Sequence, residues 1–165
     1  MDKYDELLTA KAWIIMNSGT GAYMRGHNVH RKREIASLTK MYTLYACLQI
    51  NALINVNPDK TYIKVITLLT SGTTADLRPD RLILLRDLYF AMMLPSGNDA
   101  AALLAFYYGY WIDKEATFPN LIFTKARKVD LRDKIKYANL MTKRFVQYLN
   151  ENVVKNELNH QNTKL

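Results

Sequence analysis

Short apolar and polar blocks alternate over the first part of the chain. Residues 12–17 (AWIIMN) are an apolar run of strand length, residues 18–21 (SGTG) are turn formers, and residues 22–25 (AYMR) begin a second run. Two such runs separated by a glycine-containing turn predict a β-hairpin. The polar and basic residues 27–34 (HNVHRKRE) are expected to connect this hairpin to the rest of the chain.

Helical periodicity follows the connector. Within residues 37–50, apolar positions recur at spacings of three and four, which predicts a helix with Ser37 in its first turn. Residues 61–69 (TYIKVITLL) are rich in β-branched side chains and predict a strand or an extended segment. Residues 55–59 and 71–79 are expected to be loops. The expected apolar face of the helix consists of Leu38, Met41, Leu44, Tyr45 and Leu48.

Two further helices are predicted on either side of a tight turn. Residues 80–94 have one apolar face, and Pro95 is expected to end this helix because proline disfavours the helical conformation in the residue before it. The predicted turn is residues 96–98 (SGN), and residues 99–110 form the second apolar helix, with Asp99 at its N-terminus. The expected buried positions of the first helix are Leu82, Leu85, Leu88, Tyr89 and Met92.

The C-terminal part predicts a polar, irregular segment over residues 112–130 and one long amphipathic helix over residues 131–158. The expected fold class is α+β, with a mostly helical part and an N-terminal β-hairpin that belongs to an incomplete antiparallel sheet. We expect the 165 residues to form a single domain: residues 11–50 hold the hairpin and first helix, residues 51–130 a helical lobe with the Ser-Gly-Asn turn, and residues 131–165 the long helix. The expected buried positions of the long helix are Ile135, Leu140, Met141, Phe145, Leu149 and Val153.

Composition and charge restrict the classes of partner. Apolar residues make up 49% and charged residues 23% of the chain, which is the balance of a globular protein. The net charge of +8 favours acidic partners such as nucleic acid, anionic lipid or an anionic polymer. No aromatic residues interleave with the one basic cluster, so nucleic acid binding is not expected. That cluster consists of Arg25, His27, His30, Arg31, Lys32 and Arg33.

Metal, disulfide and membrane roles find little support in the sequence. Cys47 is the single cysteine, which excludes an internal disulfide and a zinc site built from paired cysteines. His27 and His30 have no evident third ligand, so no metal is expected. No apolar run approaches the roughly 20 residues of a membrane-spanning helix. Residues 1–8 (MDKYDELL) are polar, unlike a secretory signal, and the compartment stays open.

Several other side chains invite functional interpretations, for which packing or surface roles are the expectation. Asp87 and Asp99 could be acid/base groups, but surface or helix-capping roles are expected for them. An aromatic group is expected to pack at a helix end and not to bind a ligand: Phe106, Tyr107, Tyr108, Tyr110 and Trp111.

Ser37 and Lys40 carry the first candidate chemistry. The Ser-x-x-Lys spacing of residues 37–40 (SLTK) places a hydroxyl and an amine on one helix face, a single turn apart. A serine hydroxyl becomes an effective nucleophile when a base takes its proton, and a lysine can be that base when burial or a neighbouring cation favours its neutral amine. The helix N-terminus also directs backbone N–H groups at an oxyanion formed on attack. The alternative is an ordinary start of an amphipathic helix.

The predicted turn supplies the second candidate motif, 59 residues after Ser37. In a Ser-x-Asn turn, Ser96 can relay a proton through its hydroxyl, and Asn98 can hold a substrate carbonyl through its amide. The alternative is a plain loop between helices, because serine, glycine and asparagine are common turn formers.

Together the two motifs resemble the low-molecular-mass penicillin-binding D-alanyl-D-alanine carboxypeptidases, peptidase family S11. Residues 36–40 (ASLTK) follow a hairpin and residues 95–101 (PSGNDAA) follow a helix, in the order and at the separation typical of that family. Residues 71–79 (SGTTADLRP) look like the family's loop before the second motif, and residues 145–164 like its helix before the third. The resemblance runs from about residue 11 to the end of the sequence.

The resemblance implies a β-lactamase/transpeptidase-like fold and removal of the terminal D-alanine from peptidoglycan stem peptides. Ser37 would be the nucleophile, with its N–H as half of an oxyanion hole, and Lys40 would be its base. Ser96 would relay protons, and Gly97 and Asn98 would bind substrate. β-Lactams would acylate Ser37, no cofactor or metal is implied, and the family acts outside the cytoplasm, in the cell envelope.

One family motif is not found in this sequence. The third motif, Lys-Thr-Gly or Lys-Ser-Gly on a strand beside the serine, does not occur. It would supply a second oxyanion donor and the cation that binds the substrate carboxylate. Losing one oxyanion donor typically costs about 10² to 10³ in rate. The sequence therefore predicts a fragment or truncated product with little carboxypeptidase activity.

Two alternatives share part of this pattern. A class A β-lactamase also uses Ser-x-x-Lys, and residues 157–159 (ELN) are similar to part of its deacylation segment, but Lys155 stands in the position of its glutamate. A catalytically inactive scaffold, or a relative that only binds peptide or penicillin, would keep Ser37 and Lys40 without turnover.

Overall fold

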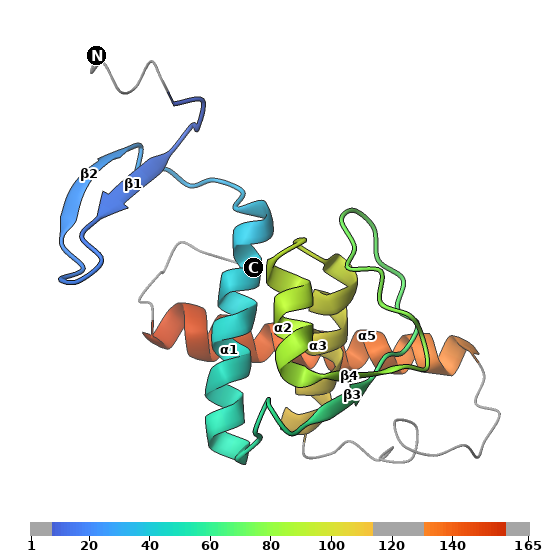
Figure 1. The fold of residues 1–165 in the computed structure, drawn as a ribbon. Helices are drawn as coiled ribbons and strands as arrows, with labels where there is room; N and C mark the ends of the chain where they lie inside the picture. Colours follow the sequence, from blue (N-terminus) through green and yellow to red (C-terminus); the bar gives the residue numbers. More distant parts are fainter. Residues whose placement is uncertain (1–7, 114–130, 158–165) are drawn as a thin grey trace. The chain divides into compact units, whose positions relative to one another are not determined.

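The computed structural model describes residues 8–113 and 131–157, which belong to two compact units. The small unit ends at Glu34 and contains a hairpin, and the larger unit begins at Ile35 and is mostly helical (Figure 1). Helices combined with antiparallel strands confirm the predicted α+β class. The single-domain organisation stays a prediction.

The small unit contains the predicted hairpin. Strand β1 (Trp13–Met16) pairs antiparallel with strand β2 (Tyr23–His27). In the connecting turn, the side-chain oxygen of Asn17 accepts hydrogen bonds from two backbone N–H groups, each at 2.9 Å. Gly21 has a φ of 68°, a left-handed conformation that glycine adopts without steric cost. The turn residues thus account for the reversal of the chain.

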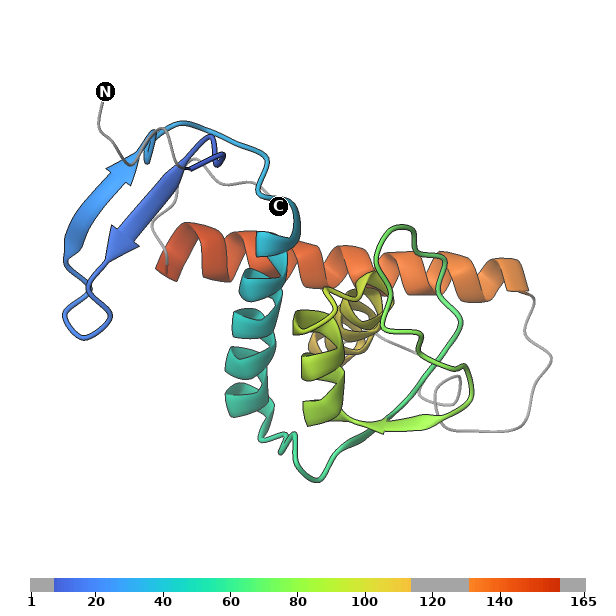
Figure 2. The ribbon, with the colours of Figure 1, turned by 45° about the horizontal axis from the view of Figure 1, so that its top comes forward.

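Among the described residues, the larger unit contains four α-helices and one two-stranded sheet. Figures 1 and 2 show α1, α2 and α3 side by side, with α5 crossing them. The helices predicted over residues 37–50 and 99–110 are confirmed, as is the described part of 131–158, while residues 114–130 and 158 lie outside the described residues. In chain order, the elements are the 3-10 turn η1 (Ala36–Leu38), α1 (Thr39–Ile54), β3 (Tyr62–Lys64), β4 (Leu82–Leu84), α2 (Leu85–Met93), α3 (Asn98–Ile112), α5 (Leu131–Tyr148) and the π-helical η2 (Leu149–Glu157).

The helix predicted over residues 80–94 is wrong at its start. Leu82–Leu84 form β4, which pairs antiparallel with β3, and Leu82 is exposed instead of buried. The helix α2 begins only at Leu85, whose N–H donates to the carbonyl oxygen of Thr61 at 2.8 Å. The other predicted positions of this helix, Leu85, Leu88, Tyr89 and Met92, are buried.

The apolar face predicted for α1 is also wrong. Leu38, Met41, Tyr45 and Leu48 are exposed, and Leu44 is only partly buried. The buried side chains of α1 are Lys40, Thr43, Ala46, Cys47, Ile50 and Asn51. A polar side of α1 can be buried because its neighbours supply polar partners.

Asn51 shows this pairing at the centre of the helical unit. Its Nδ2 donates to the hydroxyl of Tyr89 on α2 at 2.7 Å, and its Oδ1 accepts from the hydroxyl of Tyr108 on α3 at 2.5 Å. The two tyrosine hydroxyls also contact each other. Burial raises the pKa of Tyr89 to about 12 and that of Tyr108 further, so both hydroxyls stay protonated. The triad joins three helices through hydrogen bonds.

Helix α5 and the η2 segment that continues it bury only some of the predicted positions. Met141, Phe145, Leu149 and Val153 are buried at intervals of four residues. Ile135 and Leu140 are exposed, because they lie outside the stripe that faces the other helices. Helices α3 and α5 approach closely at Gly109, where a Cβ atom would lie only 1.8 Å from the carbonyl oxygen of Met141.

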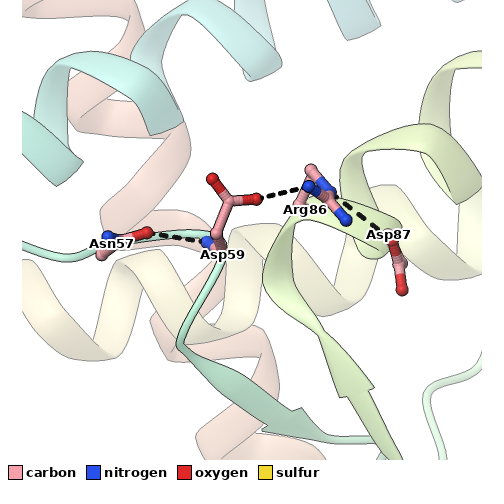
Figure 3. Close-up of polar contacts among 4 residues, drawn as sticks. All are labelled: Asn57, Asp59, Arg86 and Asp87. Atoms are coloured by element: carbon pink, nitrogen blue, oxygen red, sulfur yellow. Dashed lines mark hydrogen bonds and ion pairs between the residues drawn. The ribbon is translucent and has the colours of Figure 1, made fainter.

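One ion pair connects the start of α2 to the segment before β3, and a second lies within α2. Figure 3 shows Arg86 with a guanidinium nitrogen 2.7 Å from the Asp59 carboxylate and another 3.8 Å from that of Asp87. The N–H of Asp59 donates to the side-chain oxygen of Asn57 at 2.9 Å. The charged groups of these pairs are more than half exposed, so each pair contributes at most about 1 kcal/mol.

Candidate active site

Ser37 and Lys40 lie where η1 leads into α1. Ala36, immediately before the serine, has a φ of 44°, a left-handed conformation that redirects the chain into the helix. The Nζ of Lys40 donates a hydrogen bond to the Oγ of Ser37 at 3.3 Å. Ser37 is exposed, whereas Lys40 is only 8% exposed. The candidate nucleophile thus faces solvent and its amine partner is packed inside.

The turn between α2 and α3 reaches the same two side chains. The Oγ of Ser96 donates to the Oγ of Ser37 at 2.8 Å, and the Oδ1 of Asn98 accepts from the Nζ of Lys40 at 2.7 Å. Gly97 is buried, and a Cβ atom there would lie 2.6 Å from a backbone carbonyl oxygen of α2. Two segments far apart in the sequence therefore bring all four predicted polar side chains together.

Residues 71–77, here named the strap, hold this turn. The Nδ2 of Asn98 donates to the carbonyl oxygen of Ser71 at 2.6 Å. The Oγ1 of Thr73 donates to the carbonyl oxygen of Ser96 at 2.7 Å, and the N–H of Asn98 donates to the carbonyl oxygen of Thr73 at 2.8 Å. Sequence reasoning gave the strap no role beyond a loop. The one available signal was its run of small polar residues, SGTT, whose hydroxyls often bond to backbone groups.

Asp99 joins the strap to the first turn of α3. Its carboxylate accepts hydrogen bonds from the N–H groups of Ala75, Leu77 and Ala100 and from the hydroxyl of Thr74, at 2.8–3.0 Å. Burial alone would raise the pKa of this carboxyl group, but these hydrogen bonds outweigh it and hold the pKa of Asp99 below its usual value. Asp99 lies in the first turn of α3 as expected, but Gly97 is the N-cap residue, and three of the four hydrogen bonds of the Asp99 carboxylate go to the strap.

The other side chains considered from sequence lie away from this centre or outside the description. The aromatic group packs as expected: Phe106, Tyr107 and Tyr108 are buried. Asp87 is exposed. The side chains of Lys155 and residues 157–159 lie outside the described residues. Among residues 8–113 and 131–157, no three His, Cys, Asp or Glu side chains are grouped closely enough to hold a metal ion.

Hydropathy adds one finding about the described helices: none combines the length and the apolar character that crossing a bilayer requires.

Comparison with known sequences gives one family. The sequence model of the D-alanyl-D-alanine carboxypeptidases, peptidase S11, matches residues 2–139. The D-alanyl-D-alanine carboxypeptidase DacD of Salmonella typhimurium is 26% identical over 133 residues, which are 76% of this chain and 33% of the relative. DacC of Escherichia coli, also a D-alanyl-D-alanine carboxypeptidase, is 29% identical over 136 residues, 74% of this chain and 32% of the relative. The chain spans about a third of the length of these relatives.

Solved structures agree with this comparison. The crystal structure of the D-alanyl-D-alanine carboxypeptidase DacD from Francisella tularensis matches with a TM-score of 0.56 and 33% identity, covering 62% of this chain and 25% of that one. A mutant of the Streptomyces K15 DD-transpeptidase matches with a TM-score of 0.63 and 24% identity, covering 93% of this chain and 49% of that one. The second match concerns the fold alone and confirms the predicted transpeptidase-like architecture.

Proposed function

Because this chain belongs to the D-alanyl-D-alanine carboxypeptidase family, peptidase S11, we propose that Ser37 is the nucleophile of a serine-type D-Ala-D-Ala carboxypeptidase. The substrate would be the D-Ala-D-Ala end of a peptidoglycan stem peptide. One observation carries the proposal: the Oγ of Ser37 accepts hydrogen bonds from both the Nζ of Lys40 and the Oγ of Ser96. A nucleophile within reach of a base and of a second proton carrier meets the geometric requirement of covalent catalysis.

The proposed reaction has two stages. The neutral amine of Lys40 takes the proton of Ser37 as Oγ attacks the carbonyl carbon of the penultimate D-alanine. The peptide C–N bond then breaks as Ser96 gives its hydroxyl proton to the nitrogen of the departing D-alanine and takes in exchange the proton held by Lys40, so the amine is neutral again and the shortened peptide remains as an ester on Ser37. Water attacks this ester and gives a proton to the amine of Lys40. The amine returns that proton to the Oγ of Ser37 as the ester bond breaks, which releases the peptide and restores the serine hydroxyl. The Ser37 N–H is the proposed oxyanion donor.

Asn98 is proposed to orient both the base and the substrate. Its Oδ1 accepts from Lys40, which fixes the amine near Ser37. Its Nδ2 carries two hydrogens, and one of them bonds to the carbonyl oxygen of Ser71. The second is the proposed donor to a substrate amide carbonyl. Gly97, which has no side chain, is proposed to contribute through its backbone.

Labelling with a fluorescent penicillin tests the acylation step. We expect the purified chain to form a covalent adduct that mass spectrometry places on Ser37, because a β-lactam carbonyl is attacked as the peptide carbonyl would be. Ser37→Ala should abolish labelling, and Ser18→Ala, in the hairpin turn, is the matched control that should retain it. A folded chain that is not labelled would refute the proposal and favour a non-acylating scaffold.

Turnover is a separate measurement, as release of D-alanine from a D-Ala-D-Ala peptide. The sequence contains neither Lys-Thr-Gly nor Lys-Ser-Gly, the motif that the family resemblance assigns to carboxylate binding. We therefore expect acylation to be easier to detect than turnover. Labelling of Ser37 without D-alanine release would retain the serine as nucleophile and favour a penicillin- or peptide-binding role over a carboxypeptidase.

A further inference from the structure

We propose that Thr73 is a positioning residue for acyl transfer, which acts by holding the Ser96-Gly97-Asn98 turn from both ends. The inference rests on the proposed function, because its consequence is the rate at which Ser37 is acylated. Thr73 itself contacts none of the groups proposed to react. Its hydrogen bonds go to the backbone of Ser96 and Asn98, and the side chains of these two residues contact Ser37 and Lys40.

The two contacts of Thr73 act on opposite ends of the turn. Its hydroxyl donates to the carbonyl oxygen of Ser96 at 2.7 Å, and its own carbonyl oxygen accepts the N–H of Asn98 at 2.8 Å. Both contacts join residues more than 20 positions apart in the sequence. The peptide units on either side of Gly97 are therefore bound to one residue of the strap.

Ser96 needs such a restraint. Its φ is 58°, in the left-handed region that residues with a Cβ atom occupy only when their surroundings impose it. The direction of its side chain depends on this backbone conformation. Without the bond from Thr73, the Ser96 backbone could relax to negative φ, and its Oγ would leave the position 2.8 Å from the Oγ of Ser37.

The strap also selects the orientation of the Asn98 amide. The carbonyl oxygen of Ser71 can only accept a hydrogen bond, so it pairs with the Nδ2 of Asn98, which is the donor of the amide. The Oδ1 of Asn98 is then directed at Lys40. Gly72 lies between Ser71 and Thr73 with a φ of 85°, and a Cβ atom there would lie 2.8 Å from the Asn98 Nδ2. A glycine at this point allows the strap to approach the amide closely.

Three variants separate the hydroxyl from the shape of residue 73. Thr73→Val keeps the branched shape and removes the donor, and Thr73→Ser keeps the donor. Thr70→Val is the matched control, an exposed threonine in the adjoining loop that makes no contact with the turn among those described. The readout is acylation by a fluorescent penicillin, resolved into a dissociation constant and an acylation rate constant.

We expect Thr73→Val to lower the acylation rate constant about tenfold to a hundredfold, the cost typical of a misplaced reacting group. The dissociation constant should change less than about twofold, because the defect lies in alignment and not in binding. Thr73→Ser should restore most of the rate, and Thr70→Val should match wild type. Circular dichroism confirms that each variant is folded. Thr73→Ala, a second variant without the hydroxyl, should repeat the loss and replaces Thr73→Val if that protein does not fold.

Two results would overturn the inference: an acylation rate in Thr73→Val equal to that of Thr70→Val, or an equal loss in Thr73→Val and Thr73→Ser. If wild type itself is not labelled, the proposed function fails, and hydrogen exchange of the Asn98 amide still decides the role of Thr73. Protection of that amide that is lost in Thr73→Val and kept in Thr73→Ser supports positioning. Unchanged protection in Thr73→Val contradicts it.

Discussion

At the scale of single residues, the ionised carboxylate of Asp99 holds the strap against α3. Its pKa in the folded chain lies below the value in the unfolded chain. Protons therefore bind more tightly to the unfolded state, and the carboxylate contributes stability in full above the ordinary aspartate pKa of about 4. The contribution is lost as the pH falls through the lower, folded pKa.

Asp99→Asn should consequently lower the free energy of unfolding by about 1–3 kcal/mol near neutral pH. The amide keeps one oxygen but presents a donor to N–H and O–H groups that need an acceptor. The difference between wild type and variant should shrink as the pH falls below about 4. Urea unfolding over a pH series measures this. Asp87→Asn, at an exposed carboxylate of α2, is the control, and a pH-independent difference for Asp99→Asn would contradict the account.

The residues of the site differ in how far sequence could reveal them. Ser37 in η1 and Lys40 in α1 are one turn apart where the two segments join, so their proximity follows from local spacing alone. Ser96 and Asn98 could be paired with them only through the family resemblance, because the contact spans two distant segments. Thr73 could not be assigned to the turn, since its groups bond to the backbone of other residues, and the SGTT run does not indicate which backbone groups those are.

At the scale of elements, α1 shows where periodicity fails. Apolar residues lie on both sides of this helix, so the pattern offers two faces. The buried face is the one with polar side chains, because Lys40 meets Asn98 and Asn51 meets two tyrosine hydroxyls. Which face is buried thus depended on partners elsewhere in the fold. Similarly, β4 is a strand only because β3 pairs with it.

At the contact between α3 and α5, replacing glycine by alanine is expected to change the free energy of unfolding in the direction opposite to the ordinary one. Replacing glycine by alanine within a helix ordinarily stabilises by about 1 kcal/mol. At Gly109 the new methyl group would lie 1.8 Å from the Met141 carbonyl oxygen, so the helices must separate. We expect Gly109→Ala to destabilise the chain by about 1–3 kcal/mol, the usual cost of overpacking. Thermal unfolding measures it, and a higher melting temperature in the variant would show that α5 does not pack there.

At the scale of the whole molecule, the hairpin and the helical unit differ in their means of stability. The larger unit has a core built from four described helices, with fully buried side chains such as Tyr108 and Phe145. The small unit is a two-stranded hairpin, and its strands expose Ile14, Ile15 and Met16. An isolated two-stranded hairpin is at best marginally stable in water. A protease should therefore cleave the connection between the units more readily than the helical unit.

Trypsin should cleave early at Arg31, Lys32 and Arg33, because these residues are exposed and precede Ile35, where the helical unit begins. Limited digestion followed by mass spectrometry identifies the cut. The triple variant Arg31→Gln, Lys32→Gln and Arg33→Gln is the control, and it should lose this cleavage while other tryptic sites are unaffected. Early cleavage elsewhere, with these three bonds intact, would show that the connection is protected.

The product that begins after the connection should still react with a fluorescent penicillin. Every contact assigned to the candidate site lies in the larger unit: Ser37 and Lys40 at the junction of η1 and α1, Ser96 and Asn98 at the start of α3, and the strap between β3 and β4. The helices that hold these segments are joined by their own buried core, including the hydrogen-bonded triad at Asn51. Cleavage should therefore leave the labelling rate within about threefold of the intact chain, provided that the helical circular dichroism is retained. Loss of labelling with intact helices would mean that the hairpin unit supplies part of the site.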